Sequence, residues 1–204
     1  MASHGILLAS LLVLSCFSQT SYGIVLFSSL KDSLLVTASH TENQVLKAGI
    51  DKLTVSWGLN QSYEAGTDST FKTIKVNLCF AQVSQVDRGW RKTVDNLAKD
   101  KTCLVKIVER PYTSSKSNDS FDWIIERDVP GATYFVRAYA FDAADQQVAY
   151  GQTTDAKKTA NLFVVEGITG RHLSLDITSV AFSAFSVLSL ACFFIAEKRR
   201  AKSS

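Results

Sequence analysis

The stretch FKTIKVNLCF, residues 71–80, has an apolar side chain at every second position: Ile74, Val76, Leu78 and Phe80. Successive side chains of a β-strand point to opposite faces of a sheet, so this period of two predicts a strand with one face buried. The intervening residues point to the other, wetter face: Lys75, Asn77 and Cys79. A disulfide at Cys79 would therefore lie outside the main core.

Short runs of the same kind recur on both sides of this strand. Further predicted strands cover residues 24–27, 34–37, 53–57, 104–108, 121–126, 134–141, 147–150 and 162–165. Ahead of the strand 134–141, the sequence DVPGATY predicts a turn at Pro130 and Gly131. Many short strands separated by turns predict an all-β fold, an antiparallel sandwich of the immunoglobulin or fibronectin type III kind.

One segment, DRGWRKTVDNLAKDKTC at residues 87–103, departs from the strand pattern. Trp90, Val94 and Leu97 follow the spacing i, i+4, i+7, which predicts one short amphipathic helix with these side chains against the sandwich. Asp87 would cap the start of this helix. The charged residues of the other helix face would point outwards: Arg91, Lys92, Asp95 and Lys101.

The two ends of the chain have the composition of membrane-targeting segments. Residues 1–23 contain no Lys, Arg, Asp or Glu, and their apolar run from Ile6 to Phe17 is shorter than a membrane span of about 20 residues. Small residues follow, with Ser21 and Gly23 at positions −3 and −1 of a cleavage site. These features predict a secretory signal peptide; an uncleaved N-terminal anchor is the alternative.

Residues 177–196 form a second apolar stretch of 20 residues without a charge. As a helix it would match a hydrocarbon core of about 30 Å, although a buried core helix is the alternative. Basic residues follow at once, namely Lys198, Arg199, Arg200 and Lys202, and such clusters stay in the cytoplasm. The prediction is a type I single-pass protein: signal peptide 1–23, extracellular β-sandwich domain 24–170, juxtamembrane segment 171–176, transmembrane helix 177–196 and cytoplasmic basic tail 197–204.

Within the predicted span, Ser179, Ser183 and Ser186 fall on one helix face. Small residues on one face allow another helix to pack closely, but serine is also tolerated in lipid without a partner. A single helix provides no pathway for a solute. Any role in transport would therefore act through another protein.

Two of the four cysteines remain for the extracellular domain, because Cys16 lies in the signal peptide and Cys192 in the span. An oxidising compartment favours pairing of Cys79 with Cys103, which would tie the segment between them to a sheet. The same compartment makes the sequons at Asn60 and Asn118 candidate glycosylation sites.

The domain has few residues suited to chemistry. Residues 24–176 hold 18 basic and 18 acidic side chains, which argues against binding to a phosphate backbone. His40 and His172 are the only histidines after residue 23, so we expect neither a metal nor another cofactor. Glycine-rich phosphate loops and nucleophile elbows are absent from the sequence, and we expect no enzymatic activity.

Several motifs carry a resemblance to a known family. They are VNLCF (residues 76–80), QVDRGWRK (85–92), KDKTC (99–103), TYFVRAYA (133–140), VAYGQ (148–152) and GITGRH (167–172). With these motifs the chain closely resembles the plant accessory proteins of high-affinity nitrate transport, over residues 47–202. The first 46 residues match more loosely.

This resemblance implies a non-enzymatic subunit that binds a multi-pass nitrate transporter of the major facilitator superfamily and supports nitrate uptake at the plasma membrane of roots. In that family the region around the tryptophan and the second cysteine is associated with partner contact. Carried over to this chain, the resemblance singles out Arg91 and Asp100, with Trp90, Arg88 and Lys101 as weaker candidates.

Other interpretations of these residues and of the whole chain stay open. Trp90 is alternatively a core residue, and Arg91 and Asp100 alternatively form an internal ion pair. The chain as a whole is alternatively a single-pass adhesion or ligand-binding receptor with a β-sandwich ectodomain, although an eight-residue tail is short for signalling. A membrane-anchored hydrolase is a third possibility, for which the sequence offers no identifiable site.

Overall fold

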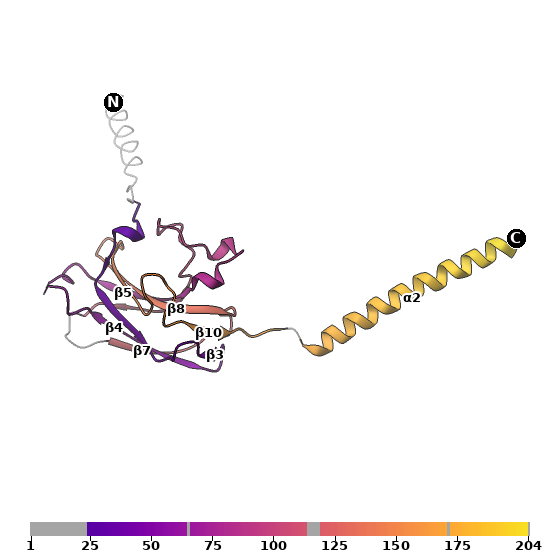
Figure 1. Cartoon of the computed structure of the whole chain (residues 1–204), viewed down its shortest axis with the longest axis horizontal. Coiled ribbons are helices and arrows are strands. Elements are labelled where there is room, and N and C mark those ends of the chain that lie inside the picture. Colours follow the sequence, from indigo (N-terminus) through magenta and orange to yellow (C-terminus); the bar gives the residue numbers. More distant parts are fainter. Residues whose placement is uncertain (1–23, 65, 114–118, 171, 204) are drawn as a thin grey trace, which may run out of the picture.

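A computed structural model of the chain describes residues 24–64, 66–113, 119–170 and 172–203. Two β-sheets pack face to face, and a long helix leaves one end of them (Figure 1). The larger sheet contains β1 (Lys31–Asp32), β9 (Gln147–Gln152), β8 (Ala132–Phe141), β10 (Phe163–Glu166), β3 (Val45–Lys47), β5 (Thr73–Phe80) and β6 (Val105–Pro111). The smaller sheet has the order β2 (Leu34–Ala38), β4 (Lys52–Leu59), β7 (Asp119–Ile124).

The predicted all-β, immunoglobulin-like architecture is confirmed. Most strand pairs are antiparallel, as expected, but β1 pairs with β9 and β3 pairs with β10 in parallel. The strand predicted at residues 24–27 is wrong: Leu26 makes only an isolated bridge with Asn96, and a 3₁₀ turn, η1 (Phe27–Ser29), follows. Strand β3 was not predicted, because three residues are too few for a period of two to stand out.

The alternation in residues 71–80 correctly predicts which face of β5 is buried in the core. Ile74, Val76 and Leu78 are fully buried between the two sheets, where they meet the buried Trp57 and Trp123 of the smaller sheet. Strand β8 is buried on both faces, because residues of the loop 81–104 and of the N-terminal segment contact the side chains that point away from the smaller sheet. The hydrogen-bonded turn before β8 lies earlier than predicted, since the Val129 amide donates to the Glu126 carbonyl at 3.2 Å. The chain bends at Gly131, and the Tyr134 hydroxyl donates to the Pro130 carbonyl at 2.6 Å.

The chain crosses between the sheets at Ser33, between β1 and β2. Asp32 pairs with Tyr150, so the crossing chain passes directly over Gly151. A Cβ atom on Gly151 would come within 2.0 Å of the Leu34 carbonyl oxygen. Glycine is required here because the two backbones approach more closely than any side chain allows.

The strand directions bring several chain segments to one end of the sandwich, which we call the exit end. Strand β10 ends there at Glu166, next to the start of β8, and Val165 pairs with Ala132. Strand β5 ends there too, since Phe80 pairs with Tyr134. The turn between β3 and β4 and the loop between β7 and β8 lie at the same end.

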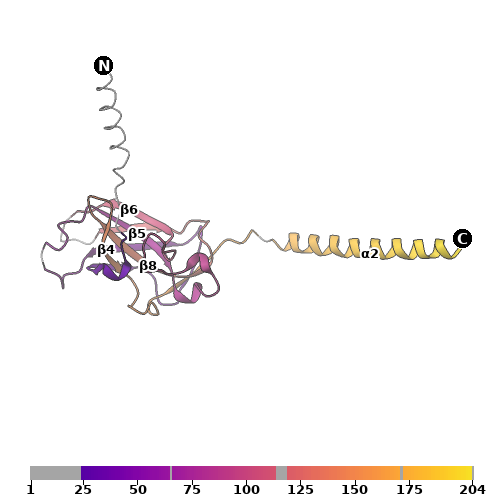
Figure 2. The ribbon, with the colours of Figure 1, turned by 90° about the horizontal axis from the view of Figure 1, so that it is seen from above.

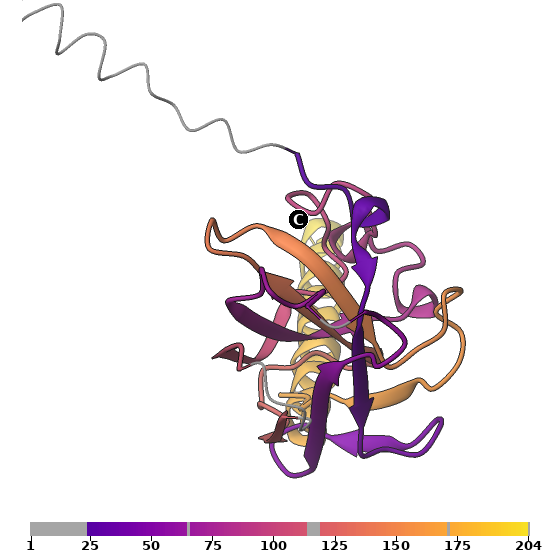
Figure 3. The ribbon, with the colours of Figure 1, turned by 90° about the vertical axis from the view of Figure 1, so that its left-hand side faces the viewer.

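Helix α2 (Leu173–Ser203) follows a six-residue linker, residues 167–172, from the exit end. Seen from above in Figure 2, the helix runs away from the sandwich, and in Figure 3 it lies behind the strands. Its residues Leu173–Lys202 are long and apolar enough to cross a membrane, and none of the most apolar 18-residue window is buried against the domain. The helix therefore extends beyond the predicted span 177–196 at both ends.

Candidate functional site

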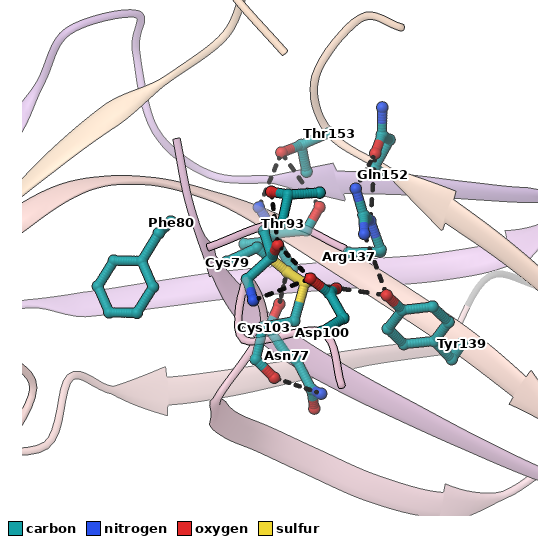
Figure 4. The surroundings of a disulfide bond; sticks show 12 residues. Asn77, Cys79, Phe80, Thr93, Asp100, Cys103, Arg137, Tyr139, Gln152 and Thr153 are labelled. Atoms are coloured by element: carbon teal, nitrogen blue, oxygen red, sulfur yellow. Dashed lines mark hydrogen bonds between the residues drawn. A yellow bond between two sulfur atoms is a disulfide. The ribbon is translucent and has the colours of Figure 1, made fainter. Parts of the chain in front are cut away.

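The candidate site is the loop at residues 81–104, between β5 and β6, which we call the tethered loop (Figure 4). The predicted disulfide is present and joins Cys79 on β5 to Cys103 near the end of the loop. As expected, Cys79 is outside the apolar core between the sheets. On the face of β5 predicted to be wetter, Lys75 and Asn77 are half-buried as expected, but Cys79 is fully buried.

The loop begins as a short turn, η2 (Gln82–Ser84), that is bonded to the start of β8. The Ala81 amide donates to the Thr133 carbonyl at 2.9 Å, and the Thr133 amide donates to Ser84 Oγ at 2.8 Å. The base of the loop is therefore fixed to the exit end of the sheet.

The helix predicted for residues 87–103 is wrong. The structure has only a 3₁₀ turn, η3 (Gly89–Arg91), followed by irregular chain, and the Asp87 side chain does not cap that turn. The Gln85 side chain competes with helix formation, because its Oε1 accepts from the Thr93 amide at 3.2 Å and from Thr93 Oγ1 at 2.9 Å. Its Nε2 donates back to the Phe80 carbonyl at 2.9 Å. These bonds favour a compact loop over a helix.

Arg91 does not point outwards as predicted, since it is only 7% exposed. Its guanidinium carbon lies 4.2 Å from the centroid of the Phe80 ring, a cation–π contact. Its Nη1 donates to the Ser84 carbonyl at 3.4 Å. The side chain thus packs the loop onto the end of β5.

Asp100 holds the other half of the loop. Its Oδ1 accepts from Thr102 Oγ1 at 2.6 Å, from the Val94 amide at 3.2 Å and from the Thr102 amide at 3.3 Å. In the described part of the chain, no ion pair joins Asp100 to Arg91. The alternative of an internal ion pair therefore fails, although both side chains do serve the conformation of the loop.

The remaining candidates lie on the outer surface of the loop. Trp90 is 61% exposed, which excludes both its predicted packing against the sandwich and a core role. Arg88 and Lys101 are exposed, as are Lys92 and Lys99. The loop therefore presents an aromatic ring and several cations on a backbone fixed by the disulfide and by internal hydrogen bonds.

The comparisons with known proteins fit this domain. Residues 27–170 match the family model described as "High-affinity nitrate transporter accessory, Ig-like domain". The chain belongs to this accessory family. The matched region covers the whole sandwich and ends just before α2.

Relatives of this accessory protein extend over nearly its whole length. "High-affinity nitrate transporter 3.1" of Arabidopsis thaliana is 51% identical, and "High-affinity nitrate transporter 3.2" of the same plant is 48% identical; each match covers 99% of this chain and 98% of the relative. "High-affinity nitrate transporter-activating protein 2.1" of Oryza sativa subsp. japonica is 47% identical over 86% of this chain and 82% of the relative. Among solved structures, neutral ceramidase from Pseudomonas aeruginosa matches 76% of this chain and 23% of its own, at 17% identity and a TM-score of 0.30.

A buried arginine, which the sequence analysis did not single out, lies beneath the tethered loop of the accessory domain. Arg137 of β8 is 1% exposed, and its Nη1 donates to the Tyr139 hydroxyl at 3.0 Å (Figure 4). Its Nε and Nη2 donate to Gln152 Oε1 at 3.2 and 2.9 Å, and its guanidinium lies 4.3 Å from the Phe27 ring centroid. The signal in the sequence is a single cation within the apolar run TYFVRAYAF.

The first described residues of the chain are hydrogen-bonded to the tethered loop. Ser28 donates to the Asp95 carboxylate from its amide at 2.8 Å and from its hydroxyl at 2.9 Å. The Leu97 amide donates to the Val25 carbonyl at 3.0 Å. Burial raises the pKa of the Tyr139 hydroxyl, while the nearby Arg137 opposes this shift. The N-terminal segment and the tethered loop thus cover the outer face of β8 together.

The other predicted sites lie apart from the loop. Asn60 follows β4, where its Oδ1 accepts from the Ser62 amide at 3.0 Å, while the sequon at Asn118 lies outside the described residues. Ser179, Ser183 and Ser186 are on α2 and exposed. In the described ranges, His, Cys, Asp and Glu side chains form no group of three or more that could hold a metal ion.

Replacing Asp100 by alanine is expected to loosen the accessory protein's loop without unfolding its sandwich. The change removes the acceptor of three hydrogen bonds and should cost about 2 kcal/mol locally. Trypsin cleavage after Lys99 and Lys101 of the folded protein should then accelerate more than tenfold, as this local free energy implies.

Asp100→Asn keeps an acceptor at the same position and should show an intermediate cleavage rate. Asp87→Asn is the matched control, because Asp87 is an exposed aspartate on the same loop whose positive φ of 57° asparagine also adopts. Equal cleavage rates for wild type and Asp100→Ala would contradict the structural role of Asp100.

Proposed function

We propose that the chain is a non-catalytic accessory subunit of a multi-pass, high-affinity nitrate transporter of the major facilitator superfamily. It binds the transporter in a hetero-oligomer and supports its stability, its localisation at the plasma membrane and nitrate uptake. The observation that carries this proposal is the 47–51% identity to plant proteins named as high-affinity nitrate transporters or transporter-activating proteins. These names favour the accessory role over an adhesion or ligand-binding receptor.

The proposed topology is that of a type I membrane protein. The signal peptide directs the sandwich outside the cell, α2 crosses the bilayer, and the basic residues from Lys198 onwards remain in the cytoplasm. A lone helix gives nitrate no route across the membrane. The chain therefore contributes to transport through its partner.

The tethered loop is the proposed contact surface for the transporter. It contains five basic and three acidic residues. One of the acidic residues, Asp100, accepts hydrogen bonds from groups inside the loop. The exposed cations Arg88 and Lys101 are the proposed direct contacts, so the facing surface of the transporter is expected to be acidic. A prefolded loop loses little further conformational entropy when it binds.

Arg91 and Asp100 act on this contact indirectly. Arg91 packs on Phe80, and Asp100 holds Val94 and Thr102, so both fix the conformation in which the exposed cations are presented. Trp90 belongs to the same exposed surface of the loop.

Reversing both exposed charges, as Arg88→Glu with Lys101→Glu, is expected to lower the amount of co-purified transporter about tenfold, or about 1.4 kcal/mol. The reason is that two attractive charge pairs become repulsive while the buried contacts of the loop stay intact. The measurement is co-purification of a high-affinity nitrate transporter with the full-length chain from solubilised root plasma membrane.

The matched control reverses Lys72 and Lys157, which are also exposed but lie outside the tethered loop. This control changes the net charge equally and should retain the transporter. If both double variants bind as well as wild type, the loop is not the contact surface. If wild type itself enriches no nitrate transporter, the accessory role is wrong.

A further inference from the structure

The exit end of the sandwich is unusually apolar. Outside α2, twelve large hydrophobic side chains of the described residues are exposed. The strand directions place seven of them at the exit end: Ile50, Val83, Val86, Trp90, Leu104, Ile124 and Ile168. At the loops of the opposite end, residues 60–72 and 142–146, Tyr63 is the exposed large hydrophobic residue among those described.

Three of these residues project from the first part of the tethered loop. Val83 is 65% exposed, Val86 64% and Trp90 61%. Hydrogen bonds of Ala81 and Ser84 to Thr133 hold the backbone on both sides of Val83. In the turn that carries Trp90, the Arg91 amide donates to the Arg88 carbonyl at 2.9 Å. Such an arrangement is unfavourable on a surface that faces water. Each exposed apolar side chain lacks the free energy of about 1.5–3 kcal/mol that its burial would contribute.

The linker to α2 starts beside these residues. Thr133 bonds to η2 and pairs with Val164 of β10, and a Cβ atom on Gly131 would lie 3.3 Å from the Gly167 amide nitrogen. Thus η2 lies about two strand spacings, or about 10 Å, from the point where the chain leaves the sheet. In Figure 2 the loop and the linker are at the same end of the sandwich.

The linker limits how far this end can lie from the surface that α2 enters. Residues 167–172 span at most about 20 Å when fully extended. The interfacial layer of a bilayer adds several ångströms on each side of its hydrocarbon core, and tryptophan is enriched in that layer because its ring is apolar and its N–H is polar.

We propose that Val83, Val86 and Trp90 insert into the interfacial layer of the bilayer that α2 crosses. The partner of this surface is lipid. The contact fixes the orientation of the sandwich on the membrane, with the tethered loop at the height where the extracellular face of an embedded protein begins. The inference rests on α2 being a membrane span but not on the identity of the transporter.

Lipid quenching of tryptophan fluorescence tests this proposal. The full-length chain is reconstituted in phosphatidylcholine vesicles with plain or brominated acyl chains, without any transporter. Trp57 and Trp123 are 3% and 4% exposed in the core, so Trp90 alone of the three tryptophans is accessible to lipid. Brominated lipid should lower the emission by about one third, and Trp90→Phe should abolish this loss.

Two further variants separate insertion from general effects. Val83→Ser with Val86→Ser should at least halve the quenching of Trp90, because the loop loses its apolar neighbours. Leu35→Ser, on the exposed face of β2, removes an equally apolar side chain away from the exit end and should leave the quenching unchanged. Flotation of each variant with the vesicles checks that α2 is inserted.

Equal wild-type emission in plain and brominated vesicles overturns the proposal. If Trp90 emission responds only after the transporter is co-reconstituted, Trp90 contacts protein and the lipid assignment is wrong. Both results are independent of the co-purification test above, so failure of the lipid contact and failure of the accessory function can be told apart.

Discussion

Replacing Gly151 by alanine is expected to prevent the domain from reaching its folded state. The new Cβ atom would lie 2.0 Å from the Leu34 carbonyl oxygen, 2.6 Å from its carbon and 2.7 Å from its Cβ. Two of these three atoms are backbone, so no rotamer change relieves the clash. The crossing from β1 to β2 would have to move, at a cost of about 3 kcal/mol or more.

That cost is a large fraction of the stability of an ordinary domain. The expected result is loss of folded, disulfide-bonded protein, measured by immunoblotting under non-reducing conditions and by thermal unfolding of any protein recovered. Gly170→Ala is the matched control, because a Cβ there meets no atom within 4 Å. Normal yield and melting temperature for Gly151→Ala would show that the strand crossing is more adaptable than its geometry indicates.

The second large effect is expected from removal of the disulfide, as Cys79→Ala with Cys103→Ala. The bond closes a segment with a sequence separation of 24, and losing it should lower the free energy of unfolding by about 3 kcal/mol. The tethered loop should loosen first, because Cys103 anchors its far end. Chemical denaturation of the full-length chain in detergent, followed by fluorescence of the buried tryptophans, measures the change.

Cys192→Ser is the control for cysteine removal, since Cys192 is a free cysteine on α2. It should unfold at the same denaturant concentration as wild type. The double alanine variant should also lose transporter in the co-purification assay, because the proposed contact surface is no longer prefolded. An unchanged denaturation midpoint would mean that the hydrogen bonds of Gln85 and Asp100 hold the loop without the covalent link.

The architecture follows from the sequence because a period of two is a local signal. Ile74, Val76 and Leu78 determine which face of β5 is buried, and the same parity correctly separates Cys79 from the main core. The signal that makes α2 long and apolar enough to cross a membrane is equally local, since it depends on a long uncharged stretch.

The conformation of the tethered loop could not be predicted in this way. The spacing of Trp90, Val94 and Leu97 is helical, but side-chain hydrogen bonds from Gln85 and Asp100 capture the backbone groups that a helix would use. Arg91 is buried because the ring of Phe80, eleven positions earlier, lies beneath it. Such contacts depend on the folded geometry of β5 and leave no periodic pattern in the sequence.

The position of β10 has a mechanical consequence. This strand is held by β8 on one side and β3 on the other, and it runs straight into the linker. A pull on α2 therefore acts along the strand. The backbone hydrogen bonds to β8 and β3 then resist sliding all at once instead of opening one by one. When a force acts on α2, the sandwich should therefore move as a rigid body before β10 separates from its two neighbouring strands.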